Sequence, residues 1–242
     1  LTYGTDLNGV QTGYFVYDVW DPRFGLGPES HHVLENFTEV DIFCGAQLVL
    51  TNGKVGLLGG DITVNGESIN QGVADVTEFD PADDSLVRVG EMWRPRWYAS
   101  STTLPNGEVL IQGGDGGRDR PEVRTVNGDF RLLTGANTFN INWFYPRNFV
   151  ARGGKVFGMA WRRMYRIDPA GSGSLEDLGM FPGGNMGPSS TAVMFAPGRI
   201  LQVGGGNDIN NASTAASIID IRGATPWVTP LAPMARRRHW GN

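Results

Sequence analysis

The amino-acid sequence predicts an all-β fold in which repeated antiparallel sheets form the blades of a propeller. Three observations favour this class. Glycine makes up 35 of the 242 residues, about twice its usual share of ~7%, and the glycines fall in turns. A hairpin closed by a double glycine recurs along the chain. No segment shows a competing helical period, which excludes the helices that parallel βαβ units need.

The recurring hairpin is clearest at 94–114, RPRWYASSTTLPNGEVLIQGG, where two apolar strands flank Asn106-Gly107. Asn-Gly is the strongest short-range hairpin signal because both residues tolerate a positive φ. Further copies are predicted at 42–60, 144–161 and 189–205. The four turn glycines are Gly53, Gly107, Gly154 and Gly198. Their separations of 54, 47 and 44 residues are typical of propeller blades. In the third copy Ala160-Trp161 replaces the double glycine.

Outer strands are predicted where alternating apolar residues run into Asp-Pro, at 17–22, 76–81 and 164–169. Proline fixes φ and withholds an N–H, so it ends the strand in a turn. Three methionines recur in the short apolar segments of the repeats, and we interpret them as core-filling side chains. They are Met92, Met180 and Met234.

We expect one incomplete propeller domain over residues 1–242. Residues 1–41 would supply outer strands of the closing blade, from the segments 1–5 and 13–20. The successive repeats are expected at 42–93, 94–143, 144–188 and 189–239. Because 234–240 repeats the spacing of 92–98, a fifth hairpin is expected to begin there. We expect this chain to supply roughly four to five blades of about seven. An incomplete propeller leaves unpaired strand edges. The expected partner is therefore the missing C-terminal part of the propeller, on the same or a separate chain.

Composition excludes several function classes. The net charge of −5 and the pI near 5.2 argue against a nucleic-acid footprint. No apolar run approaches the length of a membrane span. Cys44 is the single cysteine, so no internal disulfide can form.

The position nine residues before each turn glycine carries the chemistry. In a propeller the first strand of each blade lies innermost, so these residues should ring the central axis. They are Cys44, Tyr98, Tyr145, Ser189 and, by the spacing above, Trp240. Cys44 and Tyr98 should be neighbours. The residues alone leave two interpretations: a buried thiol beside a ring-lining tyrosine, or a covalent or metal-linked pair. A phenol ordinarily keeps its proton up to ~10, but a bound cation makes tyrosinate a ligand.

These residues resemble a family. The hairpins, Phe43-Cys44, and Arg96-Trp97-Tyr98 with its Leu-Pro-Asn-Gly turn are similar to the kelch-type propeller of galactose oxidase and glyoxal oxidase, the copper radical oxidases. The resemblance covers the whole chain as the N-terminal and middle part of that propeller. It implies that the sulfur of Cys44 is bonded to the ring of Tyr98, and that Tyr98 binds copper and holds a radical. It also implies copper and the Tyr-Cys thioether as cofactors, and a secreted, extracellular or cell-surface protein.

The sequence also departs from that family. The resemblance calls for a tyrosine-histidine pair and a second histidine in later blades, and no residue here matches them. His31 and His32 fall in a predicted polar loop and are interpreted as solvated. Arg238, His239 and Trp240 match a segment that lines the substrate in relatives, so we assign them to substrate binding. Asp115-Gly116-Gly117 stands where galactose oxidase has a tryptophan over its cofactor, so a different substrate pocket is expected.

Two function classes stay open at this point. The first is an oxidase that uses dioxygen on a primary alcohol or aldehyde and releases hydrogen peroxide. Its substrate would be a small alcohol, aldehyde or carbohydrate, and residues 1–242 alone would be inactive. The second is a non-catalytic kelch propeller that binds a glycan or a protein. A Tyr-His pair downstream would favour the oxidase.

Overall fold

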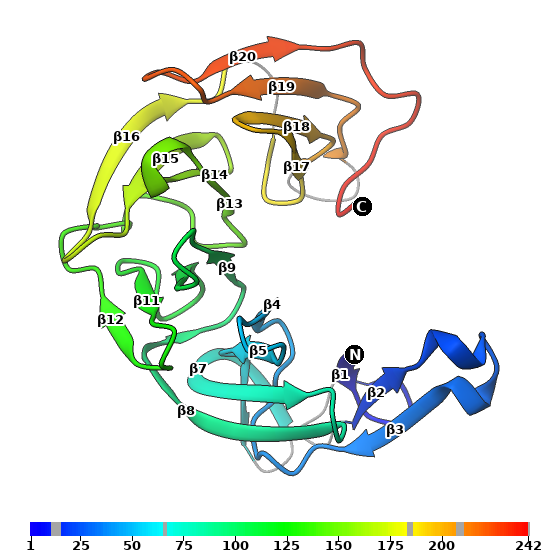
Figure 1. Cartoon of the computed structure of the whole chain (residues 1–242). Coiled ribbons are helices and arrows are strands. Elements are labelled where there is room, and N and C mark those ends of the chain that lie inside the picture. The colour runs from blue at the N-terminus through cyan, green and yellow to red at the C-terminus, as the bar shows by residue number, and fades with distance from the viewer. Residues whose placement is uncertain (11–15, 65–66, 183–185, 207–210, 242) are drawn as a thin grey trace. The chain divides into compact units, whose positions relative to one another are not determined.

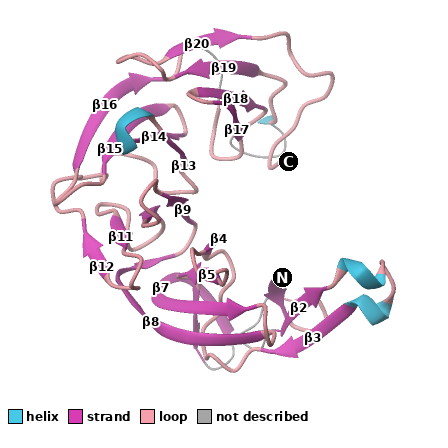
Figure 2. Cartoon of the chain, viewed as in Figure 1, coloured by secondary structure: helices cyan, strands magenta, loops and turns pink. Residues whose placement is uncertain are grey.

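A computed structural model describes residues 1–10, 16–64, 67–182, 186–206 and 211–241. These residues form antiparallel sheets and three short 3-10 turns, with no α-helix among them (Figures 1 and 2). The all-β prediction is therefore confirmed. No helix in this part of the chain is long and apolar enough to cross a bilayer. The contacts divide the chain into two compact units, Leu1–Ser101 with Gly114–Gly117, and Thr102–Gly113 with Arg118–Asn242.

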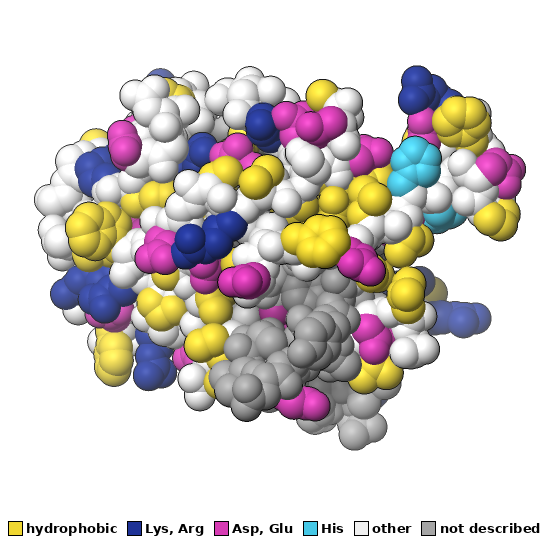
Figure 3. Space-filling model, turned by 90° about the horizontal axis from the view of Figure 1, so that it is seen from below, with side chains coloured by type: hydrophobic (Ala, Val, Ile, Leu, Met, Phe, Trp, Pro, Cys, Tyr) yellow, Lys and Arg dark blue, Asp and Glu magenta, His cyan; other side chains and the backbone are white. Residues whose placement is uncertain are grey.

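The first unit opens with a three-stranded sheet in the order β1-β2-β3. Its strands are β1 (Thr2–Thr5), β2 (Val16–Trp20) and β3 (His31–Glu35). The outer strands expected at 1–5 and 13–20 are present, although residues 13–15 lie outside the described residues. The predicted loop at His31 and His32 is wrong, because both lie in β3. They are exposed, and histidine side chains are visible at the surface in Figure 3.

The second sheet of this unit has the order β4-β5-β7-β6, with β8 also paired to β7. Its strands are β4 (Ala46–Val49), β5 (Val55–Leu58), β6 (Asp61–Val64), β7 (Glu67–Asp80) and β8 (Ser85–Arg96). The turn between β4 and β5 falls at the predicted Gly53, whose φ is +84°. The extra strand β6 was not predicted. It folds back on the first part of β7, pairing Asp61 with Gly72.

Three four-stranded sheets follow, and in each the strands lie side by side in chain order. The boundary between the two units falls after Ser101, within the first strand of the first of these sheets. The strands are β9 (Ala99–Thr103), β10 (Val109–Gly113), β11 (Glu122–Arg124), β12 (Phe130–Leu132), β13 (Arg147–Val150), β14 (Val156–Ala160), β15 (Arg163–Asp168), β16 (Ser174–Met180), β17 (Thr191–Ala196), β18 (Arg199–Val203), β19 (Ala216–Asp220) and β20 (Trp227–Pro230). The hairpin turns again fall at the predicted glycines. A sheet lies in each range expected for a repeat, except that β8 runs on to Arg96.

The sheet β13–β16 is apolar on both faces. Consecutive residues of a strand point to opposite faces, and both sets of side chains are apolar in β14. From β14, Val156 joins Leu110 and Val123 in one buried cluster. The next residue, Phe157, joins Ile200 and Ile219 of the following sheet in another. This alternation packs the sheet β13–β16 between the sheets β9–β12 and β17–β20.

The last sheet, β17–β20, leaves one apolar face partly open. Phe149, Phe157 and Met159, which pack against this sheet from the preceding one, correspond 44 residues later to Val193, Leu201 and Val203. Val193 is 53% exposed, and Leu201 and Val203 are half-buried. The same positions that join two sheets in the preceding repeat are therefore incompletely covered here.

The methionine prediction is only partly right. Met92 is buried and Met234 is half-buried, but Met180 is 54% exposed. Met180 ends β16, the outermost strand of its sheet, where it pairs with Arg163. An edge strand has no further strand to cover its side chains, so a core-filling role for Met180 is wrong.

Candidate active site

Cys44 and Tyr98 lie side by side in the first unit. The backbone N–H of Tyr98 donates to the carbonyl oxygen of Cys44 at 3.0 Å, and the two side chains share a hydrogen bond. Each residue stands just before the first strand of its repeat, β4 for Cys44 and β9 for Tyr98. Both side chains are half-buried. The two residues that the sequence singled out are thus brought together.

Both residues have a left-handed backbone, with φ of +58° at Cys44 and +66° at Tyr98. The equivalent Tyr145 and Trp240 share it, at +45° and +50°, and Trp240 N–H donates to the carbonyl of Ser189 at 2.9 Å. A non-glycine residue in this conformation costs about 1–3 kcal/mol. We call the positions of Cys44, Tyr98, Tyr145, Ser189 and, by matching spacing, Trp240 the minus-nine positions, after their place nine residues before a turn glycine. The left-handed backbone recurs at four of these five positions, which indicates that the repeat itself imposes this geometry.

The double glycines explain how the backbone after β5 approaches the end of β8 so closely. Gly60 N–H donates to the carbonyl of Arg96 at 2.9 Å, and a Cβ on Gly59 would collide with that same oxygen. The double glycine Gly204-Gly205 repeats the contact, since Gly205 N–H donates to the carbonyl of Arg238 at 3.0 Å. Only residues without a Cβ allow this backbone contact. The contact fixes Arg96 and Arg238, and so positions Tyr98 and Trp240, which follow them by two residues.

Arg96 is a buried positioning residue that sequence reasoning did not assign. Its side chain is fully buried, and Nη1 donates to the carbonyl of Gly117 at 3.1 Å. A Cβ on Gly114 would lie 2.9 Å from the Arg96 Cβ, and one on Gly117 would lie 2.6 Å from Nη1. The glycines of this loop, visible in the sequence, were the available signal. They leave room for the buried arginine side chain.

Trp97 lies against the ring of Tyr98. The Trp97 and Tyr98 rings lie 4.0 Å apart between centroids, with their planes tilted by 34°. The sequence has no tryptophan in the loop 115–117, where the resembled family has one. An indole nevertheless lies against the Tyr98 ring, supplied by the preceding residue.

Tyr98 is a neutral phenol at ordinary pH. Burial, the charge of Cys44, their shared hydrogen bond and the charge of Asp61 raise the pKa of Tyr98 to about 12. Asp61 is fully buried, and its Oδ1 accepts N–H bonds from Ile62 and Gln71, both at 2.8 Å. A cation bound at Tyr98 would offset these negative charges and favour the phenolate.

Tyr3 is a second phenol near the thiol, and sequence reasoning gave it no role. Burial and then the charge of Cys44 raise the pKa of Tyr3. Its Oη donates to Gln47 Oε1 at 2.9 Å, so β1 is tied to β4 beside the thiol. Tyr3 and Cys44 are 41 positions apart, and no sequence pattern linked them.

The residues assigned to substrate binding lie in the second unit. Arg238 is exposed and His239 is half-buried. Trp240 is 48% exposed and forms an aromatic cluster, with ring centroids 5.8 Å from Phe144 and 6.0 Å from Tyr145. Their proposed role is carried by the resemblance.

The donor set for a metal is small. In the described part of the chain, no group of three or more His, Cys, Asp or Glu side chains could hold an ion. Tyr98 supplies one oxygen of a kind that Cu(II) accepts, whereas a square Cu(II) site takes several nitrogen or oxygen donors. The pair Cys44–Tyr98 therefore fits a copper-linked cofactor in chemistry, and further ligands are needed to complete a site.

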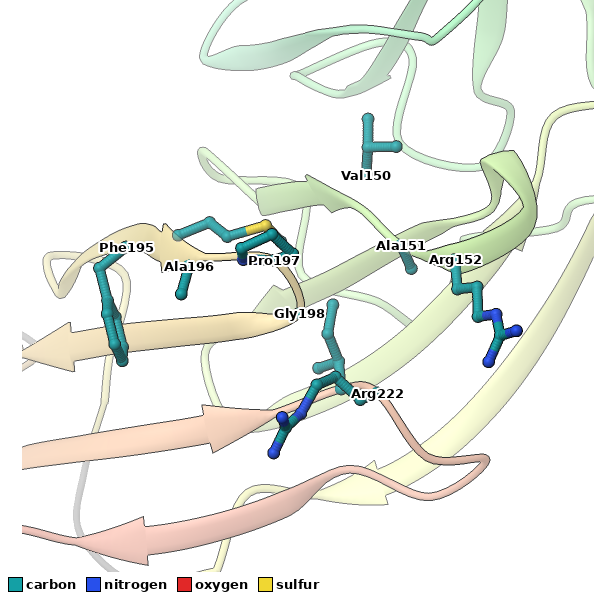
Figure 4. A pocket seen from close by; sticks show the side chains of 10 residues that line it. Val150, Ala151, Arg152, Phe195, Ala196, Pro197, Gly198 and Arg222 are labelled. Carbon is teal, nitrogen blue, oxygen red and sulfur yellow. The ribbon is translucent and has the colours of Figure 1, made fainter.

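A separate cavity of about 810 Å³ lies at the turn ends of the β13–β14 and β17–β18 hairpins. Figure 4 shows Arg152 and Arg222 around its apolar lining. Arg222 is paired with Asp220 at 2.5 Å. Tyr145 and Ser189 come just before β13 and β17, at the ends of these hairpins that lie away from the turns. The cavity therefore does not include the minus-nine residues.

Comparison with known proteins supports the sequence-based resemblance. No family model matches the chain. A solved fungal alcohol oxidase, described as one of the AA5 family in complex with copper, superposes on 95% of the chain with a TM-score of 0.76 at 19% identity. The predicted resemblance to copper oxidases is confirmed. At this identity the likeness shows the shared propeller fold.

Two curated proteins match in sequence. Art an 7 of Artemisia annua, named as a candidate aldehyde oxidase, is 26% identical over an alignment of 173 residues that covers 64% of this chain. A WSC domain-containing protein of Arthroderma benhamiae is 24% identical over an alignment of 188 residues that covers 71% of this chain. The chain spans 28% and 19% of these proteins and 50% of the solved oxidase.

Proposed function

We propose that this chain is part of a copper radical oxidase-like protein that oxidises primary alcohols or aldehydes. The observation that carries the proposal is the direct contact of Cys44 with Tyr98 through backbone and side chains. An alcohol would lose two electrons and two protons to give an aldehyde, and dioxygen would take them up as hydrogen peroxide. The copper named for the structural neighbour and the aldehyde oxidase named for the curated relative support this class.

The cofactor we propose is a thioether between Cys44 Sγ and a ring carbon of Tyr98. Its formation removes the thiol hydrogen and one ring hydrogen, and dioxygen accepts the two electrons and two protons. Hydrogen bonding between the side chains supports the required approach. Bound copper would supply one-electron chemistry and polarise the substrate oxygen.

The chain's own groups have defined tasks in this scheme. Tyr98 would give up its Oη proton, bind the metal through oxygen and carry the unpaired electron. The thioether would tune the ring, while Trp97 shields one face of it. Arg96 would act as a positioning residue, because its side chain fixes the loop at Gly114–Gly117. Arg238, His239 and Trp240 would contact a small alcohol, aldehyde or carbohydrate.

The remaining metal ligands would come from the C-terminal part of the propeller, on the same chain or a separate one. The partly open face of β17–β20 supports this, since Val193, Leu201 and Val203 stand where the preceding repeat packs on its neighbour. We propose a single kelch-type domain with repeats at 42–93, 94–143, 144–188 and 189–239. The resemblance also supports an extracellular or cell-surface protein.

The test replaces Tyr98 by Phe in the complete, copper-loaded protein. This keeps the ring and removes the oxygen, so peroxide release from alcohols and aldehydes should stop while the melting temperature changes little. Tyr17→Phe is the matched control, because Tyr17 Oη donates to the carbonyl of Asp84 at 2.9 Å and Tyr17 is not part of the proposed cofactor. Turnover at the parental rate in the Tyr98 variant would exclude the proposed role.

A further inference from the structure

Trp161 occupies a backbone position that glycine holds in the other repeats. Ala160 pairs with Arg163, so Trp161 and Arg162 alone join β14 to β15. The φ of Trp161 is +53°. Its counterparts seven residues after the other turn glycines have positive φ as well, and they are Gly60, Gly114 and Gly205.

The choice of tryptophan has a structural cost. A two-residue hairpin whose first turn residue has positive φ normally takes glycine there, and a bulky residue is strained in that conformation. Strain of this kind is concentrated at functional sites. The turn holds the Trp161 side chain 40% exposed, so much of the indole surface remains available for contact.

This indole lines a cleft of about 460 Å³, a volume in the range of small-molecule sites. The segment 139–143 and the turn at 160–163 supply most of the lining. Phe139, which is 61% exposed, and Trp143 contribute two further aromatic side chains. The cleft thus has three flat apolar surfaces, an arrangement suited to a ring-shaped ligand.

The charged groups of the cleft are all cationic. Among the described lining residues the charged side chains are Arg118, Arg162 and Arg163, with no carboxylate. Arg163 is paired with Asp177 outside the lining. The guanidinium of Arg118 lies over the Phe139 ring, 5.7 Å from its centroid. This leaves a positive cleft, in contrast to the net charge of −5 of the whole chain.

Two asparagine amides add hydrogen-bonding groups to the aromatic and cationic side chains of the cleft. Asn140 and Asn142 line the same cleft. Asn142 Oδ1 accepts the N–H of Phe144 at 2.9 Å, which orients the amide and leaves its Nδ2 group to donate to a ligand. Neutral donors of this kind suit hydroxyl groups, while guanidinium groups suit carboxylates.

We propose that this cleft binds an acidic carbohydrate, a short oligosaccharide that contains uronic acid. The apolar faces of its rings would lie on Trp161 and Phe139, its hydroxyls would meet the asparagine amides, and a carboxylate would pair with Arg162 or Arg118. A neutral sugar would use the aromatic surfaces but leave the arginines without a partner. This site contains neither Cys44 nor Tyr98, and it stands independently of the oxidase proposal.

Calorimetric titration of the complete protein with trigalacturonate tests the proposal, with cellotriose as the neutral probe. Trigalacturonate should bind at least about tenfold more tightly, since charge-assisted pairs are roughly twice as strong as neutral ones. About 0.5 M NaCl should weaken that binding, because salt screens exposed charges. Trp161→Gly restores the glycine of the repeat, so the chain should fold while losing binding of both sugars.

Arg162→Gln should lose the preference for trigalacturonate and keep weak binding of cellotriose. The matched controls are Trp227→Ala and Arg236→Gln, which remove an exposed tryptophan and an exposed arginine outside the cleft and should bind as the parent does. The proposal is overturned if the parent does not bind trigalacturonate. It is equally overturned if the folded Trp161→Gly and Arg162→Gln variants bind it like the parent.

Discussion

The N–H of Tyr98 donates to the carbonyl oxygen of Cys44 at 3.0 Å, and Trp240 makes the same contact with Ser189 at 2.9 Å. In these two pairs of successive repeats the same backbone link joins the minus-nine residues. In one pair that link joins a thiol to a phenol, and in the other a hydroxyl to an indole. The fold provides the proximity, and the side chains decide which chemistry can follow.

The first prediction concerns the covalent bond between Cys44 and Tyr98. In complete protein made with copper, the tryptic peptides 24–54 and 97–118 should be found linked, two hydrogens lighter than their sum. Reductant should not release them, since a thioether is not a disulfide. Tandem mass spectrometry would place the link, and Cys44→Ser provides the control without sulfur. A freely alkylated Cys44 in copper-loaded folded protein would contradict the cofactor.

The second prediction concerns residues 1–242 produced alone. They offer Tyr98 as one metal ligand in the described chain and expose apolar side chains on β17–β20, including Val193 and Phe195. We expect little bound copper, no peroxide release and poor solubility. Val193→Lys should improve solubility by charging the open face. Copper content and peroxide release equal to those of the complete protein would show that the ligands have been misplaced.

Local signals in the sequence were sufficient for the hairpins. Asn52-Gly53 and Asn106-Gly107 predicted their turns because Asn-Gly selects a turn geometry without help from distant residues. The same spacing then aligned Cys44 with Tyr98. The left-handed backbone at both residues could not be foreseen, because bulky residues rarely adopt it and tertiary contacts impose it.

Contacts between distant segments set the rest of the site. Tyr3 is held near Cys44 by the bond that ties β1 to β4 through Gln47. The charge of Asp61, the first residue of the unpredicted strand β6, acts on Tyr98. The exposure of Met180 depends on its place at a sheet edge. None of these relationships leaves a periodic pattern in the sequence.

The third prediction tests the close contact between Gly158 of β14 and Tyr165 of the paired strand β15. A Cβ on Gly158 would collide with the ring of Tyr165, which is fully buried. Gly158→Ala should therefore lower the free energy of unfolding by about 1–3 kcal/mol, the usual cost of overpacking a core. Gly90→Ala is the matched control, since a Cβ there has no atom within 4 Å. Equal denaturant midpoints for the two variants would rule out this close contact.

The fourth prediction concerns stability at alkaline pH. Burial raises the pKa of Tyr165, although its hydrogen bond to Gln112 at 2.7 Å opposes the rise. The unfolded tyrosine ionises near ~10. The stabilisation from the neutral buried phenol is thus fully present below that pH and is lost as pH rises above it, by up to about 1.4 kcal/mol per pH unit. Tyr165→Phe should cost about 1 kcal/mol at neutral pH through the lost hydrogen bond, yet show a shallower decline between about pH 10 and 12. Urea unfolding across this range measures both effects. The same alkaline slope in variant and parent would mean that other groups carry the loss.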